Sequence, residues 1–202
     1  MMSLLKKMYF IISACILRCK HVHLGKNSNI WINGSTNNGQ FLHIGNNFVL
    51  HKNWQINVYP SRNVPAPQIS IGDNVDIGRN FTCYCAGSIR IGNNVLMGGN
   101  ILITDNNHGA DPRKISYRDQ ELIVKNTTIE DGVWIGEGCY ILAGSYVGEK
   151  SIIGANSVVN GNVPPYSMVA GSPARVIKKY DQLNNQWRPI DEKDQCKEDI
   201  SY

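Results

Sequence analysis

The residues of this chain that could serve as a base, a nucleophile or a metal ligand include five histidines and six cysteines. Cys83 and Cys85 form a C-x-C pair, but no second pair with zinc spacing accompanies it. Alternate residues of a strand point to one face, so two neighbouring thiols on that face are favoured over metal ligation. We therefore predict no metal site, and free thiols are typical of the reducing cytoplasm. The cysteines are Cys15, Cys19, Cys83, Cys85, Cys139 and Cys196.

His108 is the histidine of T-D-N-N-H-G, near the start of a long polar segment, residues 104–127. An imidazole with an ordinary pKa of about 6.5 is mostly neutral near pH 7 and can accept a proton from a hydroxyl. Asp105, three residues earlier, could orient that imidazole. The alternative is a solvated loop histidine, which is how we interpret the other four: His21, His23, His43 and His51.

A six-residue repeat must position these side chains. From Ile129 the sequence reads IEDGVW, IGEGCY, ILAGSY, VGEKSI, IGANSV and VNGNVP, and similar blocks begin at Leu24, Ile44, Ile71 and Ile91. A strict period of six fits neither an α-helix nor a simple strand alternation.

Each block predicts a short strand and a corner at which Gly or Asn accepts a positive φ. Three faces close a triangular prism of about eighteen residues per coil, hydrogen-bonded as parallel sheet. Residues 129–164 then make two uninterrupted coils. The opening aliphatic residue points inward, and so can the fifth residue of a block, as at Val75, Val95, Val133, Ser145 and Ser157.

The chain of 202 residues, 42% hydrophobic and 18% charged, predicts one soluble domain with a sizeable core. The repeat is interrupted by a proline-marked loop (Pro60, Pro65, Pro67) and by residues 104–127; long loops on a rigid solenoid usually carry function or an interface. We expect a β-helix domain over residues 22–180, in which 174–180 form a short strand or helix, and a polar, mobile tail over 181–202. A net charge of +4 without a basic, aromatic-rich block argues against nucleic acid.

The N-terminus, residues 1–21, predicts an amphipathic helix that caps the domain or touches a membrane surface. Its apolar residues fall at helical spacings with basic residues between them. The run from Met8 to Leu17 is shorter than the roughly 20 residues of a membrane span. A cleaved signal sequence is the alternative, because I-S-A-C resembles a lipoprotein cleavage box. The apolar positions are Leu4, Leu5, Met8, Ile11, Ile12, Cys15 and Cys19.

The chain resembles the hexapeptide-repeat acyltransferases, the left-handed β-helix family of galactoside, maltose and polysaccharide O-acetyltransferases. The resemblance covers about Leu24 to Lys178 and is most specific in V-P-P-Y followed by G-S-P-A-R. It implies an all-β fold, a left-handed parallel β-helix with a short N-terminal helix and a long inserted loop. The left hand comes from the resemblance alone, since parallel crossovers are otherwise right-handed. It also implies a homotrimer that uses acetyl-CoA, with no metal.

The resemblance assigns roles to individual residues. It makes His108 the general base that deprotonates an acceptor hydroxyl, while a backbone N–H stabilises the oxyanion. Tyr84 falls where the sugar acetyltransferases carry a sugar-binding Asn, and Gly161 where some relatives have a phosphate-binding lysine. The positions implied to lie along acetyl-CoA are Trp134, Glu137, Ala155, Asn160, Gly161, Arg175 and Lys178; Trp134 could also merely fill the coil surface, and Arg175 and Lys178 could be a solvated edge.

The function that follows is O-acetyl transfer from acetyl-CoA to a sugar hydroxyl of a surface polysaccharide or its precursor. We expect it in the cytoplasm, where the N-terminal helix could contact the inner face of the membrane. One alternative is another acceptor, such as serine, an amino-sugar nucleotide or an antibiotic. A second is a non-catalytic β-helix binding module. Related carbonic anhydrases bind metal through three histidines on the coils, whereas His108 stands without such partners.

Overall fold

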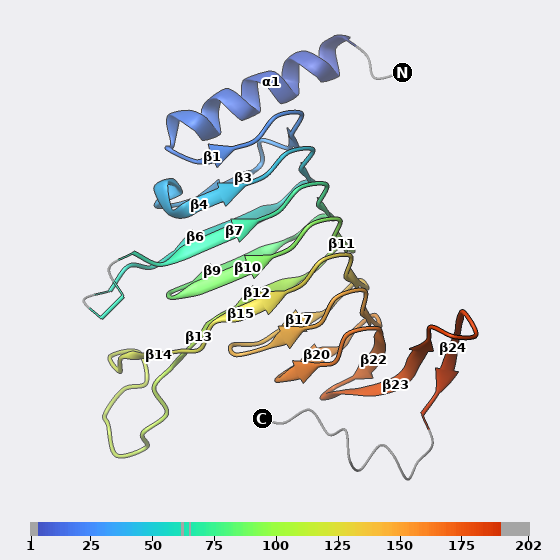
Figure 1. Ribbon diagram of the computed structural model, residues 1–202. Helices are drawn as coiled ribbons and strands as arrows, with labels where there is room; N and C mark the ends of the chain where they lie inside the picture. Colours follow the sequence, from blue (N-terminus) through green and yellow to red (C-terminus); the bar gives the residue numbers. More distant parts are fainter. Residues whose placement is uncertain (1–3, 62, 65, 191–202) are drawn as a thin grey trace.

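The computed structural model describes residues 4–61, 63–64 and 66–190. The chain winds through three sheets that form the faces of a prism and are parallel except at the C-terminal end of one of them, and helix α1 (Leu4–Cys19) lies across the end where the first coil begins (Figure 1). The chain visits the sheets in the order A, B, C and then A again, so each turn makes one coil. This confirms the predicted fold class of stacked hexapeptide coils.

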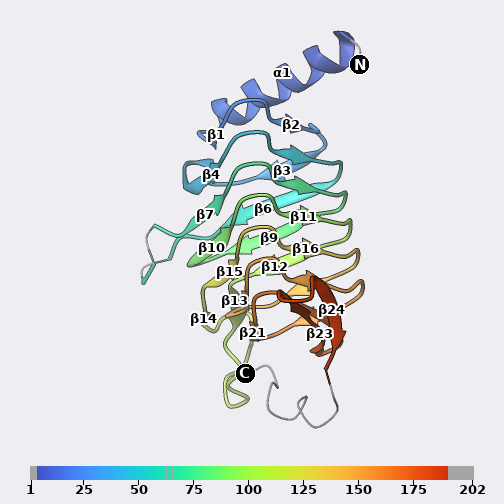
Figure 2. The ribbon, with the colours of Figure 1, turned by 45° about the vertical axis from the view of Figure 1, so that its right-hand side comes forward.

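Short strands make up each sheet, in register with the coils above and below (Figure 2). Sheet A holds β1 (His23–Leu24), β4 (Leu42–Ile44), β7 (Gln68–Ile71), β10 (Ser88–Ile91), β15 (Thr127–Ile129), β18 (Tyr146–Val147) and β21 (Asn162–Val163). Sheet B holds β2 (Asn29–Ile30), β5 (Val49–Leu50), β8 (Asp76–Ile77), β11 (Leu96–Met97), β16 (Trp134–Ile135), β19 (Ile152–Ile153), β22 (Ser167–Gly171), β23 (Ala174–Asp181) and β24 (Gln186–Pro189). Sheet C holds β3 (Gly34–Thr36), β6 (Trp54–Val58), β9 (Thr82–Cys85), β12 (Leu102–Thr104), β17 (Tyr140–Ile141) and β20 (Val158–Val159), and a 3-10 turn η1 spans Gly39–Phe41.

The core is a column of aliphatic side chains inside the prism. The residues that open the blocks after 129 are at most 1% exposed, and the fifth residues are buried beside them. Stacking them removes apolar area from water at about 25 cal/mol per Å², which is the main stabilisation available to such short strands. The block-opening residues are Ile129, Ile135, Ile141, Val147, Ile153 and Val159.

Coil length departs from the predicted eighteen residues over the first half of the chain. Eighteen residues separate paired positions between β15 and β20, as in Ile129 and Val147, whereas sixteen separate Val147 and Val163 in the last coil. Upstream the spacing is longer, as in Leu24 with Ile44 and Ile44 with Ile71. The extra residues lie at the corner between sheets C and A, where a longer loop can project without changing the strand register. The insertions that interrupted the repeat are therefore all on one edge.

Asparagines at the corners form two ladders along the prism. In one, Asn80 accepts a hydrogen bond from Asn53 at 3.2 Å and donates one to Asn100 at 2.7 Å. Asn53, Asn80 and Asn100 have φ of 58–62°, the left-handed region in which the short Asn side chain is tolerated. The predicted role of Asn at the corners is confirmed.

We expect Asn80→Ala to lower the free energy of unfolding by about 1–3 kcal/mol. The change removes two hydrogen bonds of the ladder. It also places at positive φ an alanine, which lacks the polar side chain that makes this conformation tolerable for Asn. Urea denaturation at fixed protein concentration measures this. Asn80→Gly, which keeps the backbone freedom and loses only the ladder, should cost less; an equal cost for both variants would contradict the backbone contribution.

Helix α1 packs on the first coil through a face of three buried residues, Phe10, Ser13 and Leu17. Phe10 stacks edge-on against Trp31 at a centroid distance of 5.5 Å, and the Tyr9 hydroxyl accepts a hydrogen bond from the Ile32 N–H at 2.8 Å. The helix thus caps the core, as one prediction proposed. The apolar residues named in that prediction lie on the opposite, exposed face of the helix. No helix in the described part of the chain is long and apolar enough to cross a membrane.

The chain after Asp181 differs from the predicted mobile tail. Strand β24 pairs antiparallel with β23, and Trp187 stacks on Tyr180 at 5.3 Å. The Arg188 guanidinium contacts the Asp181 carboxylate at 2.8 Å, which closes the hairpin. Residues 174–181 are a strand because β22 offers them a sheet edge. The remaining tail, with Cys196, lies outside the described residues.

Candidate functional site

His108 ends strand β13 (Asn106–His108) of a hairpin that projects from the corner between sheets C and A. The partner strand is β14 (Leu122–Val124), and His108 lies opposite Leu122 in the antiparallel pair. Residues 104–127, predicted as a loop, are therefore partly ordered as sheet. Because its strand leaves the prism, the His108 side chain is exposed and accessible to a ligand.

The Asp105 carboxylate locks the base of this hairpin. It is fully buried and accepts hydrogen bonds from the backbone N–H groups of Ala86 and Gly87, both at 2.8 Å, and from the Asn106 amide at 2.9 Å. The Cys85 thiol also contacts it at 3.3 Å. Among the described residues, no hydrogen bond joins Asp105 to His108. The hypothesis that Asp105 orients the imidazole directly is therefore corrected: its carboxylate holds the neighbouring coil instead.

Two threonines also hold the foot of the hairpin, where it leaves the prism. The Thr127 hydroxyl donates to the Thr104 carbonyl at 2.8 Å, and the Asn106 N–H donates to the Thr104 hydroxyl at 3.2 Å. The Lys125 N–H donates to the Asp105 carbonyl at 2.8 Å. Both ends of the hairpin are therefore tied to buried groups, which fixes the direction in which His108 projects.

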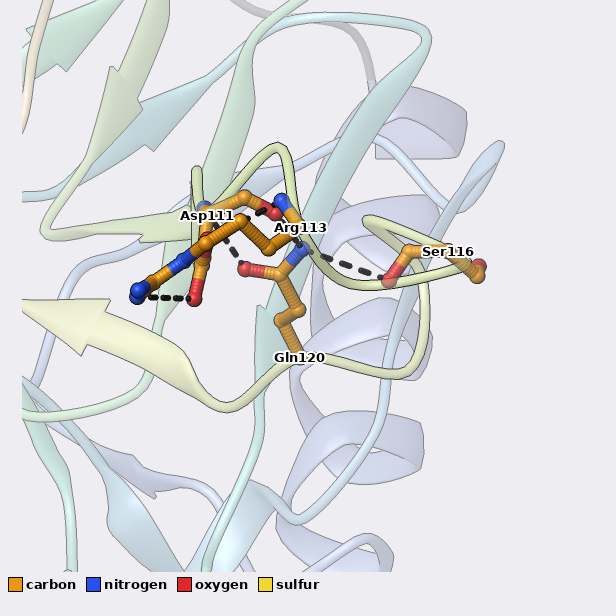
Figure 3. Close-up of polar contacts among 4 residues, drawn as sticks. All are labelled: Asp111, Arg113, Ser116 and Gln120. Carbon is orange, nitrogen blue, oxygen red and sulfur yellow. Dashed lines mark hydrogen bonds and ion pairs between the residues drawn. The ribbon is translucent and has the colours of Figure 1, made fainter.

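The tip of the hairpin is ordered by its own polar contacts (Figure 3). The Gln120 amide accepts from the Asp111 N–H at 2.9 Å and donates to the Asp111 carbonyl at 3.0 Å. Arg113 forms a two-pronged ion pair with Asp111, at 2.9 and 3.0 Å, which lowers the pKa of that carboxyl. The same Gln120 amide reaches the Ser116 carbonyl at 3.4 Å. These contacts give the long polar loop a defined conformation at its tip.

A hollow of about 320 Å³ lies beside His108 and is lined by Tyr59, Tyr84, Asn106, His108 and Leu122. The rings of Tyr59 and Tyr84 lie 6.2 Å apart. The Tyr84 hydroxyl donates to Gln55 at 3.0 Å, and the Asn57 amide donates to the Tyr59 hydroxyl at 3.2 Å. The hollow therefore combines two aromatic rings, one amide, one imidazole and a leucine side chain.

The structure brings together His108, predicted as the base, and Tyr84, predicted as a substrate-binding residue. Tyr59 and Asn106 also line the hollow and were missed. Tyr59 lies just beyond β6, one coil before Tyr84, at the mouth of the proline-marked loop. Both loops are inserted at the same corner of the repeat, and this feature of the sequence could have indicated Tyr59 as a neighbour of His108.

The Cys83 and Cys85 thiols point into the core, as expected for alternate residues of one strand. Burial raises the pKa of Cys83 well above its usual value; burial, then the charge of Asp105, raises that of Cys85. These thiols stay protonated at physiological pH and are poor nucleophiles. No group of three or more His, Cys, Asp or Glu side chains arranged to hold a metal occurs in the described ranges.

The residues implied to bind acetyl-CoA lie on different edges of one chain. Glu137 and Ala155 are at the corner between sheets B and C, and Trp134 is on the outer face of sheet B, 51% exposed. Asn160 and Gly161 are at the corner between C and A, in line with the hairpin. Arg175 and Lys178 are on β23, which extends sheet B. A single chain therefore brings only part of this set to the edge that carries His108.

Two of these residues also have a structural explanation. The Glu137 carboxylate accepts from the Asn100 amide at 2.9 Å and contacts Arg79 at 3.5 Å, so it ends the asparagine ladder. Gly161 has a φ of 118°, which a residue with a Cβ rarely adopts. The backbone thus favours glycine at this corner.

Family models match two parts of the chain. A bacterial transferase hexapeptide model of six repeats covers residues 126–161, and a hexapeptide repeat of succinyl-transferase covers 68–105. WbbJ of Escherichia coli K12, assigned to lipopolysaccharide biosynthesis as an O-acetyl transferase, is 30% identical over 126 residues. Rv3034c of Mycobacterium tuberculosis H37Rv, assigned as an acetyltransferase, is 29% identical over 110 residues. These alignments cover 59% and 54% of this chain, and 64% and 37% of the two relatives.

Solved structures share the fold. The hexapeptide-repeat acetyltransferase VCA0836 of Vibrio cholerae is 28% identical, with a TM-score of 0.61 over 86% of this chain and 82% of that one. The N-acyltransferase AntD of Bacillus cereus, solved with dTDP and 3-hydroxybutyryl-CoA, superposes with a TM-score of 0.70 at 20% identity, over 85% and 90% of the two chains. The class defined by fold and repeats is the left-handed parallel β-helix. By its repeats and its fold, the chain is similar to the hexapeptide-repeat transferases.

Proposed function

We propose that this protein is an acetyltransferase that moves an acetyl group from acetyl-CoA to a sugar hydroxyl of a surface polysaccharide or its precursor. The observation that carries the proposal is the hollow that places His108 beside two tyrosines and Asn106. The likeness to WbbJ supports O-transfer to a glycan. VCA0836, another relative, has been solved with acetyl-CoA.

In this mechanism His108 accepts the hydroxyl proton while the acceptor oxygen attacks the thioester carbonyl. The tetrahedral intermediate then expels the thiolate of coenzyme A, and the proton on His108 passes to the sulfur. A backbone N–H near the reacting carbonyl would stabilise the oxyanion. The exposed imidazole at the edge of the hollow is accessible for both proton transfers.

A homotrimer completes the site in this proposal. The outer face of sheet B carries apolar side chains in one register, Leu96, Trp134 and Ile152, the first two about half exposed. Three prisms packed side by side would cover such faces. They would also bring the Trp134 face of one chain, and the adjoining corner with Glu137 and Ala155, to the His108 hairpin of the next. Sedimentation that shows a fully active monomer would contradict this assembly.

The acceptor site is proposed to be the hollow itself, with Tyr59 and Tyr84 as rings against which a sugar face packs. Aromatic rings supply apolar contact area, and the neighbouring amides can hydrogen-bond hydroxyls. We propose that the acetyl transfer takes place in the cytoplasm, at the inner face of the membrane, where glycan precursors and acetyl-CoA meet.

The proposal is tested by thiol release from acetyl-CoA with a panel of polysaccharide repeat units, serine and an amino-sugar nucleotide. Release that depends on a glycan hydroxyl supports it, and release only with the amino sugar would assign N-transfer instead. If no acceptor gives release and coenzyme A does not bind, the binding-module alternative is favoured.

We expect Tyr59→Ala to raise the acceptor KM about tenfold, which is about 1.4 kcal/mol of lost binding, with little change in kcat. Tyr59 is 39% exposed at the hollow, so its removal deletes contact area without opening the core. Tyr59→Phe should retain most of the affinity. The matched control is Tyr146→Ala, on sheet A outside the hollow. An unchanged acceptor KM in Tyr59→Ala would remove this residue from the site.

A further inference from the structure

The outward face of helix α1 is apolar along its whole length. Leu5 is 80% exposed, Ile11 64%, and Met8 and Ile12 52% each. At 3.6 residues per turn this face lies opposite the buried Phe10 and Leu17. Soluble monomers rarely leave so continuous an apolar stripe in water, which indicates a surface that something covers. The exposed apolar residues of the helix are Leu4, Leu5, Met8, Ile11, Ile12 and Ile16.

Basic residues flank this stripe and acidic ones are absent from this end of the sequence. Lys7 and Arg18 lie along one border of the stripe, as the helical spacing places them, and Lys20 directly follows the last helical residue, Cys19. The first acidic residue of the chain is Asp73, and seven of the 20 Lys and Arg residues precede it. The rest of the chain holds the other 13 against all 16 acidic residues, so the excess positive charge belongs to the helix and the first coils.

A groove of about 340 Å³ follows the border between the helix and the first coil. Its lining includes Lys7, Arg18 and Ile11 on the helix and Asn27 and Asn29 on the coil. Arg18 also donates to the carbonyls of Leu24 and Gly25, at 3.2 and 3.4 Å, which holds its guanidinium beside the groove. Cationic and amide groups at the edge of an apolar stripe suit an anionic phosphate whose acyl chains meet the stripe.

We propose that α1 binds the surface of an anionic phospholipid bilayer, lying in the interface plane with its exposed stripe in the acyl boundary. Charge complementarity selects this occupant over a second copy of the chain, because two such ends would bring like charges together. The buried face of Phe10, Ser13 and Leu17 stays on the prism, so the helix needs no unfolding to bind.

Binding through α1 would set the distance between the acceptor hollow and the membrane surface. This inference rests on the proposed function. Tyr84 on β9 is two strands from β3 in sheet C, and the His108 hairpin follows β12, one strand further. With strands about 4.8 Å apart and a helix about 10 Å thick, the hollow opens roughly 20–25 Å from the lipid. That height suits a glycan carried on a membrane lipid rather than the lipid headgroup itself.

The test is cosedimentation of the full chain with vesicles of phosphatidylcholine alone or with one third phosphatidylglycerol. We expect at least tenfold stronger partitioning onto the anionic vesicles, reduced in 0.5 M salt. Met8→Gln with Ile12→Gln should lower that partitioning at least tenfold, and Lys7→Gln should weaken the preference for the anionic lipid. The matched control changes two exposed apolar residues elsewhere, Ile115→Gln with Leu183→Gln, and should leave partitioning unchanged.

Equal partitioning of wild type and Met8→Gln with Ile12→Gln would overturn the proposal, as would no binding to either vesicle. Sedimentation without lipid that shows end-to-end pairing, lost in the same variant, would assign the stripe to a second copy and also overturn it. Vesicle binding requires no turnover. Its failure is therefore distinguishable from a failure of the acetyltransferase proposal, which thiol release reports.

Discussion

We expect His108→Ala to lower kcat by about 10²- to 10⁴-fold while coenzyme binding stays nearly unchanged. The substitution removes the imidazole of the hollow, so an acceptor hydroxyl must lose its proton without a positioned base. The side chain is exposed and lies outside the core, so the fold should be retained. Acceptor-dependent thiol release, measured beside coenzyme binding by calorimetry, separates the two effects.

The matched control for that variant is His51→Ala. His51 is also exposed and lies 3.6 Å from Asp76 on sheet B, away from the hollow. Its loss should leave turnover within about twofold, because a surface contact of this kind contributes little to the fold. Wild-type-like turnover in His108→Ala would exclude the imidazole from the chemistry.

The second large effect is expected at Asp105. Asp105→Ala leaves the buried N–H of Ala86 and the partly buried N–H of Gly87 without their acceptor and should lower the free energy of unfolding by about 2–5 kcal/mol. Asp105→Asn keeps one acceptor oxygen but turns an amide N–H₂ toward one of those donors, so it should lie between alanine and the wild type. Urea denaturation at fixed protein concentration measures both.

Asp105 is a positioning residue in this account, because it acts on His108 only through the hairpin. Its variants should therefore lower kcat and raise the acceptor KM together, while coenzyme affinity holds. Asp119→Ala, an exposed carboxylate in the same loop, is the control and should change neither stability nor kinetics. Unaltered unfolding of Asp105→Ala would show that the two N–H groups find other acceptors and that the buried carboxylate is not the anchor.

The sequence predicted the repeating scaffold that carries the candidate site. Aliphatic residues at a period of six predicted the three sheets, because a side chain that stacks on its counterpart one coil away leaves little freedom in strand register. The break in that period located the long insertion that carries His108. Family resemblance also suggested a substrate-binding role for Tyr84, which stays a prediction, and the structure places Tyr84 beside His108 in the hollow. The asparagine corners followed from backbone sterics alone.

The rest depended on contacts between coils that no local pattern encodes. Asp105 looked like a partner for His108 because it lies three positions before it, yet the preceding coil offers its carboxylate the backbone N–H groups of Ala86 and Gly87. Tyr59 reaches the hollow because its loop and the His108 hairpin leave the prism at the same corner. The strand over 186–189 formed because β23 presented an open edge.

The sequence by itself determined the β-helix, the corners and the amphipathic character of residues 4–19, because each follows from side-chain spacing within a few residues. The tertiary structure decided which face of that helix is buried, what Asp105 binds and which side chains surround His108. Those outcomes depend on which coil a segment stacks against. Stacking is set by coil lengths that vary along the chain, so the neighbours of a side chain appear only once the prism is closed.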